Sequence, residues 1–170
     1  MTAFKAYDIR GKLDTEITPK FAYTLGRAYA DVFQPQTIAV GADVRLSSNS
    51  LKTALIHGLN DGGVDVLDLG LAGTEEVYFA ALALQVEGGI EITASHNPAE
   101  YNGYKVYWED GAQVTSPKDV EIISEVNRIT DYSMCKTMDE KAATEAGLFH
   151  IIGEEVDDLY MTELKKLVIN

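Results

Sequence analysis

Short apolar runs rich in β-branched residues alternate along this chain with stretches of helical spacing. The runs cover residues 6–9, 37–41, 64–69 and 89–93. The helical stretches between them are roughly 11 to 15 residues long, the length that a crossover between parallel strands needs. The alternation therefore predicts an α/β fold, a three-layer α/β/α domain with helices on both faces of a mostly parallel, mixed sheet.

Each expected helix has a start or stop signal in the sequence. Thr18-Pro19 is typical of an N-cap with proline in the first turn, and Phe21, Leu25, Ala28 and Val32 follow at helical spacing. Ser47 or Ser48 is expected to cap a second helix that ends at Gly62-Gly63, and Thr74 to cap a third. A further helix is expected over 117–129, with Val120, Ile123 and Val126 on one face.

The last forty residues give weaker signals. The pattern fades over 130–145, residues 147–152 suit a short edge strand, and apolar residues from Val156 to Leu167 have helical spacing. We expect one domain over residues 1–150, and in 151–170 the beginning of a connection to a second domain. A length of 170 residues suits one domain with a proper core.

Composition favours a soluble, cytoplasmic protein. The apolar fraction is 46% and the charged fraction 24%, both ordinary for a globular domain. No window approaches the ~20 apolar residues of a membrane helix, and the first residues lack the apolar region of an export signal. Cys135 is the single cysteine, so its expected state is a reduced thiol. We expect no membrane association.

The net charge of −13 argues against nucleic acid as a partner, because phosphate backbones are bound by basic patches. Much of the acidic excess lies toward the C-terminal side, where it suits a solvated surface. Cationic residues lie elsewhere in the chain, at Arg10, His96 and Lys105. The local charge there is compatible with a phosphorylated ligand.

Ser95 stands in the run Thr93-Ala-Ser-His-Asn-Pro98, which follows one expected strand and precedes the apolar run 104–108. An Asn-Pro pair ends regular structure, so Ser95 is expected in a turn where its hydroxyl can reach a ligand. The plainer alternative is a serine that stabilises the turn through side-chain hydrogen bonds.

Residues 93–98 and the downstream Asn102-Gly-Tyr-Lys105 together resemble the phosphoserine loop of the α-D-phosphohexomutases, the phosphoglucomutases and phosphomannomutases. Segments 7–11 (YDIRG) and 41–45 (GADVR) match the same family in the same order. The run 73–80, with Gly-Thr-Glu where many relatives carry Pro-Thr-Pro, is most like bacterial phosphomannomutases of GDP-mannose synthesis. A single short match is weak evidence, whereas several in order are specific.

The resemblance implies a reaction. Ser95 would carry a phosphoryl group, give it to one hydroxyl of a hexose phosphate and recover the other phosphate. Mannose 6-phosphate and mannose 1-phosphate would interconvert in this way, with hexose 1,6-bisphosphate as intermediate and activator. Mg2+ would be bound through the phosphate on Ser95, with its other protein ligands among acidic residues of an absent second domain.

The resemblance and the residue chemistry together nominate a site. Lys105 is expected to act as a general acid or base and to neutralise phosphate charge, and His96 to move a proton or bind phosphate. Tyr7, Arg10 and Asn97 are expected to bind the substrate or its phosphate. The simpler readings stay open: an exposed strand lysine, a surface ion pair at Arg10, core packing of Tyr7 and a turn-forming Asn97.

Asp43 and Arg45 are expected to orient the Ser95 loop, pairing with neighbouring loops more than taking part in chemistry. Asn102 and Gly103 are expected to form turns.

The resemblance also predicts the partners of the chain. The expected partners are a hexose phosphate and the remaining domains of the same enzyme, since the family's magnesium, sugar and phosphate loops have no counterpart after Lys105. We therefore expect the isolated chain to be inactive. Two alternatives stay open: a phosphoglucomutase of the same family, and a non-catalytic sugar-phosphate-binding or interaction domain.

Overall fold

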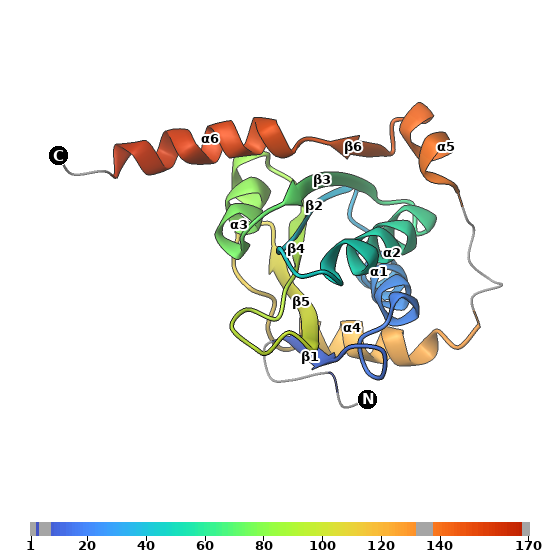
Figure 1. Cartoon of the computed structure of the whole chain (residues 1–170). Coiled ribbons are helices and arrows are strands. Elements are labelled where there is room, and N and C mark those ends of the chain that lie inside the picture. Colours follow the sequence, from blue (N-terminus) through green and yellow to red (C-terminus); the bar gives the residue numbers. More distant parts are fainter. Residues whose placement is uncertain (1–2, 4–7, 132–137, 168–170) are drawn as a thin grey trace.

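A computed structural model describes residue 3 and residues 8–131 and 138–167 of the chain. They form one six-stranded sheet with helices on both of its faces (Figure 1). In chain order the elements are β1 (Ile9–Lys12), α1 (Pro19–Phe33), β2 (Thr37–Ala42), α2 (Ser48–Asp61), β3 (Asp65–Leu71), α3 (Thr74–Ala83), β4 (Gly88–Ile92), β5 (Tyr101–Trp108), α4 (Lys118–Arg128), α5 (Glu140–Glu145), β6 (Phe149–Ile151) and α6 (Gly153–Lys166).

The sheet has the strand order β1-β5-β4-β2-β3-β6. β4, β2, β3 and β6 pair in parallel, while β5 runs antiparallel between β4 and β1. α2 links the parallel neighbours β2 and β3, and α3 links β3 to β4 on the other side of β2; these are the crossover helices that the sequence pattern predicts. The expectation of a mostly parallel, mixed sheet is confirmed.

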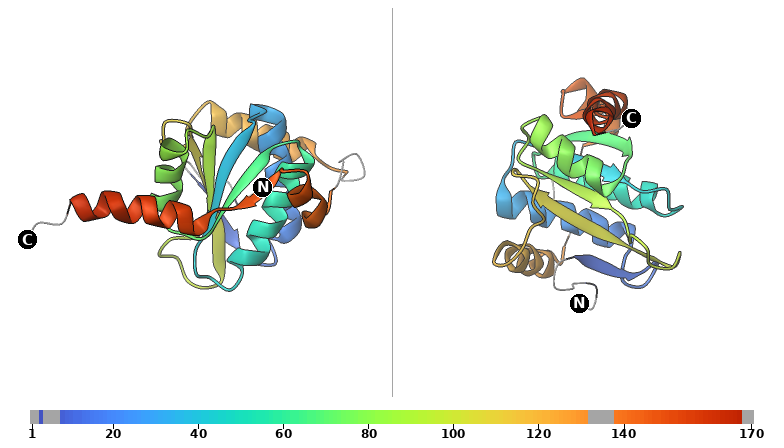
Figure 2. Two further views of the ribbon diagram at one scale, coloured as in Figure 1. Left: turned by 90° about the horizontal axis from the view of Figure 1, so that it is seen from above. Right: turned by 90° about the vertical axis from the view of Figure 1, so that its left-hand side faces the viewer.

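Two clusters of buried side chains make the layers. The larger cluster joins one face of the sheet to α1, α2 and α4, and the smaller joins the opposite face to α3 and α6. The two turned views of Figure 2 show this arrangement of helices about the strands. The predicted three-layer α/β/α architecture is therefore confirmed.

Two glycines set the contact between α1 and α2. A Cβ atom at Gly26 would lie 2.3 Å from the carbonyl oxygen of Leu55, and one at Gly58 would lie 2.2 Å from that of Tyr23. Both positions need a hydrogen in place of a side chain, because the two backbones approach too closely for a methyl group.

Several element boundaries differ from the sequence expectations. The first strand begins at Ile9 where we expected it to cover 6–9, and β5 begins at Tyr101, so Asn102 and Gly103 are strand residues and not turn residues. A Cβ at Gly103 would lie 2.0 Å from the carbonyl oxygen of Ile9. That closeness reflects the pairing of β1 with β5, a long-range contact that local residue preferences do not encode.

The expected N-cap positions are right for α1 and α2 and wrong for α3. Thr18 caps α1, its hydroxyl accepting a 3.1 Å hydrogen bond from the Phe21 backbone N–H. The N-cap of α3 is Gly73 and not Thr74. Ser47 holds the N-cap position of α2, one of the two expected, but makes no side-chain capping bond. Its hydroxyl accepts a hydrogen bond from Asn102.

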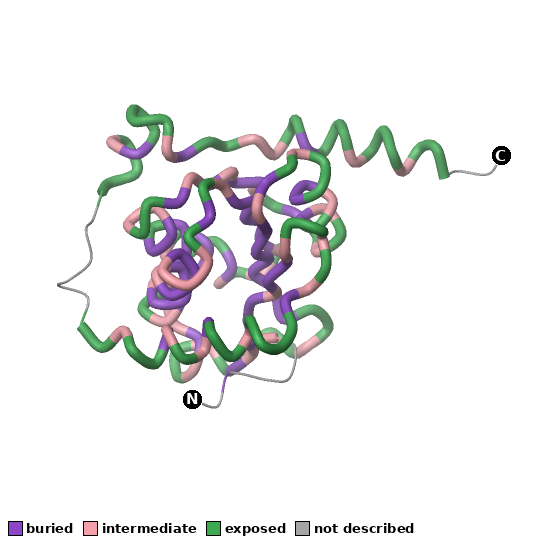
Figure 3. The backbone as a smooth tube through the Cα atoms, turned by 180° about the vertical axis from the view of Figure 1, so that it is seen from behind, coloured by how far each residue is buried: buried purple, intermediate pink, exposed green. Residues whose placement is uncertain are grey.

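The C-terminal helices are less buried than their spacing suggests. In α4, Ile122 and Val126 are buried, but Val120 is 54% exposed, so the expected apolar face is shifted. Of the α6 residues that the structure describes, Val156 alone is buried, and α6 projects beyond the sheet (Figures 1 and 3). β6 is the edge strand expected near residue 150, whereas the division at residue 150 stays a prediction.

Within the described residues, no helix combines the length and the apolar character that crossing a bilayer requires.

Candidate active site

The loops after β2, β3 and β4 meet at one edge of the sheet. Parallel strands direct their carboxyl ends to the same side, where ligands of α/β proteins collect. These loops and β5 enclose a hollow of about 470 Å³. Its lining residues are Asp43, Val44, Arg45, Gly73, Thr74, Glu75, Glu91, Thr93, Ser95 and Lys105.

Ser95 is exposed at this edge and has an unusual backbone conformation. Its φ of 54° lies in the left-handed region, which costs a residue with a side chain about 1–2 kcal/mol. The conformation is supported locally, because the Ser95 N–H donates a 2.8 Å hydrogen bond to the hydroxyl of Thr93. Such local strain recurs at functional positions of proteins.

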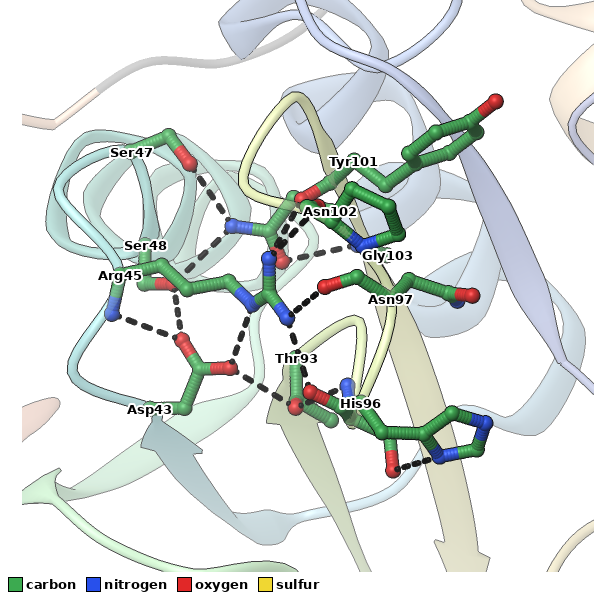
Figure 4. A network of polar contacts seen from close by, with 12 residues as sticks. Asp43, Arg45, Ser47, Ser48, Thr93, His96, Asn97, Tyr101, Asn102 and Gly103 are labelled. Atoms are coloured by element: carbon green, nitrogen blue, oxygen red, sulfur yellow. Dashed lines mark hydrogen bonds and ion pairs between the residues drawn. The ribbon is translucent and has the colours of Figure 1, made fainter.

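Arg45 holds the Ser95 loop from within (Figure 4). Its guanidinium donates to four backbone carbonyl oxygens of the loop: those of Ser95 at 2.8 Å, Asn97 at 2.7 Å, Pro98 at 3.0 Å and Tyr101 at 3.2 Å. Three of these carbonyls belong to the irregular segment between β4 and β5 and the fourth to the first residue of β5, so the arginine joins the loop to the start of that strand and supplies donors to its backbone. The contacts are those that the expected orienting role requires.

Asp43 organises the same network from the end of β2. Its carboxylate accepts a 2.6 Å hydrogen bond from the Ser48 hydroxyl and a 2.8 Å bond from the Thr93 hydroxyl. It also forms a 3.2 Å ion pair with Arg45 Nε. A carboxylate satisfied on both oxygens fixes the arginine and the loop start together.

Asn102 extends the network into the sheet. It is fully buried, and its amide donates to the hydroxyls of Ser47 at 2.9 Å and Ser48 at 3.0 Å. Its side-chain oxygen accepts a 2.8 Å bond from the Gly103 N–H. Asn102 therefore joins β5 to the start of α2, a role that the expected turn function did not include.

Lys105 lines the hollow from β5, the strand that pairs with β4. It follows Ser95 by ten positions in the sequence. It is half-buried, and it lies directly opposite Glu91 in the antiparallel register. Glu91 is fully buried, and burial raises its pKa to about 9, with the charges of Asp43 and Glu76 acting in the same direction. The hollow thus combines a nucleophilic hydroxyl, a cation and a buried acid.

Not all of the other predicted residues line the hollow that contains Ser95. Arg10 and Asn97 line a separate hollow of about 480 Å³ that Ser95 does not line. Arg10 forms a 3.1 Å ion pair with Asp8, the simpler arrangement left open for it. His96 is exposed, with its Nδ1 3.4 Å from the Ser95 hydroxyl. Tyr7 lies outside the described residues.

Sequence reasoning did not single out Glu91 as a site residue. The signal was present, since a carboxylate in the centre of the run Gly-Gly-Ile-Glu-Ile interrupts an otherwise apolar buried strand. Thr93 and Ser48 were likewise unmarked, because hydroxyl residues beside a loop have no distinctive spacing.

A magnesium site was expected only through a phosphate on Ser95. In the part of the chain that the structure describes, no three His, Cys, Asp or Glu side chains gather as metal ligands. Asp43 is already engaged by its neighbours, and burial raises the pKa of Glu91 to about 9, which disfavours the carboxylate that a metal ion would bind. The described residues do not by themselves make a ligand set for Mg2+, so we derive no step through it.

Comparison with known proteins agrees with this geometry. Residues 1–133 match the phosphoglucomutase/phosphomannomutase family, α/β/α domain I. The chain therefore belongs to the phosphoglucomutase/phosphomannomutase family. A phosphomannomutase of Escherichia coli is 46% identical over 175 residues that span the whole chain, and one of Vibrio cholerae is 40% identical over 182 residues. The resemblance to bacterial phosphomannomutases is confirmed.

Solved structures give the same result. A phosphoglucomutase/phosphomannomutase family protein from Burkholderia thailandensis matches with a TM-score of 0.70 and 32% identity over 88% of this chain. The chain covers 32% of that structure, and it spans 38% of the length of the Escherichia coli relative. The similarity therefore concerns the first part of longer proteins.

Proposed function

We propose that this chain is the phosphoserine-bearing domain of a phosphomannomutase, in which Ser95 carries the phosphoryl group that moves between mannose 6-phosphate and mannose 1-phosphate. The observation that carries the proposal is the exposed, left-handed Ser95 at the end of β4 with Lys105 in the same hollow. Relatives named phosphomannomutase, 46% and 40% identical over the whole chain, support the choice of sugar.

The proposed chemistry assigns a part to each residue. Phosphorylated Ser95 transfers its phosphoryl group to the free hydroxyl of the hexose phosphate, which gives a hexose 1,6-bisphosphate and the free serine. The serine hydroxyl then takes the other phosphoryl group from the bisphosphate, which releases the isomeric monophosphate and restores the phosphoserine. Lys105 neutralises charge on the transferring group and exchanges a proton with the sugar hydroxyl. His96, with its Nδ1 3.4 Å from the Ser95 hydroxyl, exchanges a proton at that oxygen. Asp43 and Arg45 hold the loop in the reactive geometry.

Phosphate recognition by Arg10, Tyr7 and Asn97 stays part of the proposal. A ligand at Arg10 would have to compete with Asp8 for the guanidinium, or bind through the nitrogens that Asp8 leaves available. Mg2+ would be held by the phosphate on Ser95 and by acidic groups outside these residues. The product would feed GDP-mannose synthesis, in the cytoplasm.

The test is Ser95→Ala in the complete protein that contains this domain. Loss of the nucleophile should remove the phosphorylated form in mass spectrometry and lower turnover by roughly three powers of ten or more, because no other hydroxyl takes its place. Thr93→Ser, which keeps the hydroxyl that supports the loop, is the matched control. Turnover of Ser95→Ala near the wild-type value would contradict the assignment.

The family includes phosphoglucomutases, so substrate choice needs its own comparison. Assaying mannose 1-phosphate and glucose 1-phosphate side by side measures the ratio of kcat/KM for the two sugars. A higher value for glucose would assign the protein to the phosphoglucomutase alternative, and absence of turnover with both would favour a non-catalytic binding domain.

A further inference from the structure

Glu91 is the buried group that the proposed mechanism leaves unexplained. It lies in the middle of β4, with no exposed surface, and neither carboxyl oxygen has a hydrogen-bond partner among the residues that the structure describes. A buried polar group without hydrogen-bond partners costs free energy, so its presence here requires an explanation other than stability. An apolar residue would be the ordinary choice for a central strand.

The domain has a niche shaped for this side chain. Glu91 pairs with Gly41 of the neighbouring strand β2, and a Cβ at position 41 would lie only 2.6 Å from Glu91 Oε2. The same point is 2.7 Å from Val77 and 3.0 Å from Ala72. The carboxyl group therefore occupies the space that a side chain at residue 41 would fill, against apolar neighbours of α3 and the loop before it.

On its other side Glu91 faces Lys105. The two residues are directly opposite each other in the antiparallel ladder of β4 and β5, and both line the hollow that holds Ser95. Opposite residues of such a ladder have their Cβ atoms about 4.5–5.5 Å apart on the same face. The acid thus lies under the cation that the proposed function assigns to phosphoryl transfer.

Titratable groups from four parts of the fold surround Glu91. Asp43 after β2 and Glu76 of α3 favour its neutral form, Lys105 of β5 and Lys52 of α2 favour ionisation, and Tyr107 of β5 lies within its field. Burial is the largest influence and raises the pKa to about 9. At neutral pH the group is therefore a carboxylic acid and not a carboxylate.

We propose that Glu91 is a positioning residue for Lys105: its carboxyl group fills the niche beside Gly41, opposite Lys105 in the ladder, and supports the lysine side chain at the floor of the hollow. An ionised glutamate would bind Lys105 as a counter-ion and add negative charge beside a phosphorylated Ser95. A phosphate dianion on Ser95 opposes that ionisation further, so the phosphorylated state keeps the acid neutral. This inference rests on the proposed function for the role of Lys105.

The first test is a titration that needs no substrate. In the protein labelled with 13C at glutamate carboxyl groups, the Glu91 signal, assigned by its loss in Glu91→Gln, should titrate with a midpoint well above pH 7. Lys105→Met should raise that midpoint further, because it removes a cation that favours ionisation. Glu75→Gln, which alters an exposed carboxylate of the same hollow, is the matched control and should preserve the Glu91 signal.

Two results would overturn the proposal. One is a Glu91 midpoint in the ordinary glutamate range near pH 4, and the other is a midpoint that does not respond to Lys105→Met.

The second test separates positioning from packing in the complete protein. Glu91→Gln keeps the volume and the neutral charge, whereas Glu91→Ala empties the niche, so Ala should lower kcat about tenfold or more relative to Gln with a smaller change in KM. Equal kcat in the two variants would contradict a positioning role. If the complete protein were inactive as a mutase, the expected titration would still support the Glu91–Lys105 coupling, and only the proposed function would fail.

Discussion

At the scale of single residues, the Ser95 loop depends on Arg45 more than on its own sequence. Four backbone carbonyls between Ser95 and Tyr101 accept hydrogen bonds from one guanidinium. Asp43 accepts a further hydrogen bond from Nε of the same side chain. The serine is therefore held by a residue about fifty positions away in the chain, from the loop after a different strand.

Replacing Arg45 tests this dependence. Arg45→Met keeps the length of the side chain but removes every donor, so we expect a loss of about 1–3 kcal/mol in the free energy of unfolding. The local effect should be larger: amide hydrogen exchange at residues 95–102 should accelerate. Arg27→Met, which breaks an ion pair with Asp31 inside α1, is the control and should leave the loop unaffected. Unchanged exchange at 95–102 in Arg45→Met would refute the role.

The sequence predicted part of the site and missed the rest for a physical reason. Ser95, Arg45 and Lys105 belong to sequence motifs whose residue types indicate a role in the site. The structure places all three around one hollow. Glu91 and Asn102 gain their significance from burial and from partners in distant strands. Such partners follow from sheet register, which a reading of local patterns does not supply.

At the scale of elements, the approach of α1 to α2 depends on Gly26 and Gly58. Alanine at a helical position ordinarily stabilises relative to glycine, by about 0.4–1 kcal/mol. At Gly58 the sign should reverse, because the added methyl would meet the Tyr23 carbonyl at 2.2 Å.

We expect Gly58→Ala to lower the free energy of unfolding by about 1–3 kcal/mol, the usual range for overpacking, as measured by urea denaturation. Gly73→Ala, where the nearest contact of the new Cβ would be 3.5 Å, serves as the comparison. A Gly58→Ala protein as stable as Gly73→Ala would mean that the helices can separate at little cost.

Element prediction succeeded where the signal is local. Buried parallel strands and amphipathic helices have clear periods, so β2, β3, β4 and their crossover helices lie where expected. It failed at β1 and at the start of β5, which are defined by pairing with each other. The face of α4 was misplaced because contact with α1, and not spacing alone, decides which residues are buried.

At the scale of the whole molecule, α6 joins the domain through few contacts, and one of them is sensitive to pH. Glu76 of α3 shares a hydrogen bond with Asp157 of α6, and burial together with this neighbouring carboxyl raises the pKa of Glu76 to about 7. Two carboxyl groups share a hydrogen bond only while one of them is protonated.

The sign of the pH effect follows from this raised pKa. An unfolded glutamate titrates near pH 4.3, so protonation of Glu76 favours the folded state, and its contribution to stability is lost as pH rises through about 7. Thermal unfolding of wild type and Glu76→Gln between pH 5 and 8 measures it: the difference in Tm should change across that window, with wild type losing more stability as pH rises. Parallel curves would contradict the shared proton.

The same helix has a mechanical consequence. α6 is anchored near its start by Val156 and by the ring of Tyr160, which lies 5.3 Å from that of Phe79. From Val156 to Lys166 the helix rises about 15 Å at ~1.5 Å per residue. It is therefore a lever: a rotation of ~10° about the anchor displaces its far end by roughly 2.6 Å over that length. A rotation that is small at the α3 surface is therefore a displacement of several ångströms at the far end of α6.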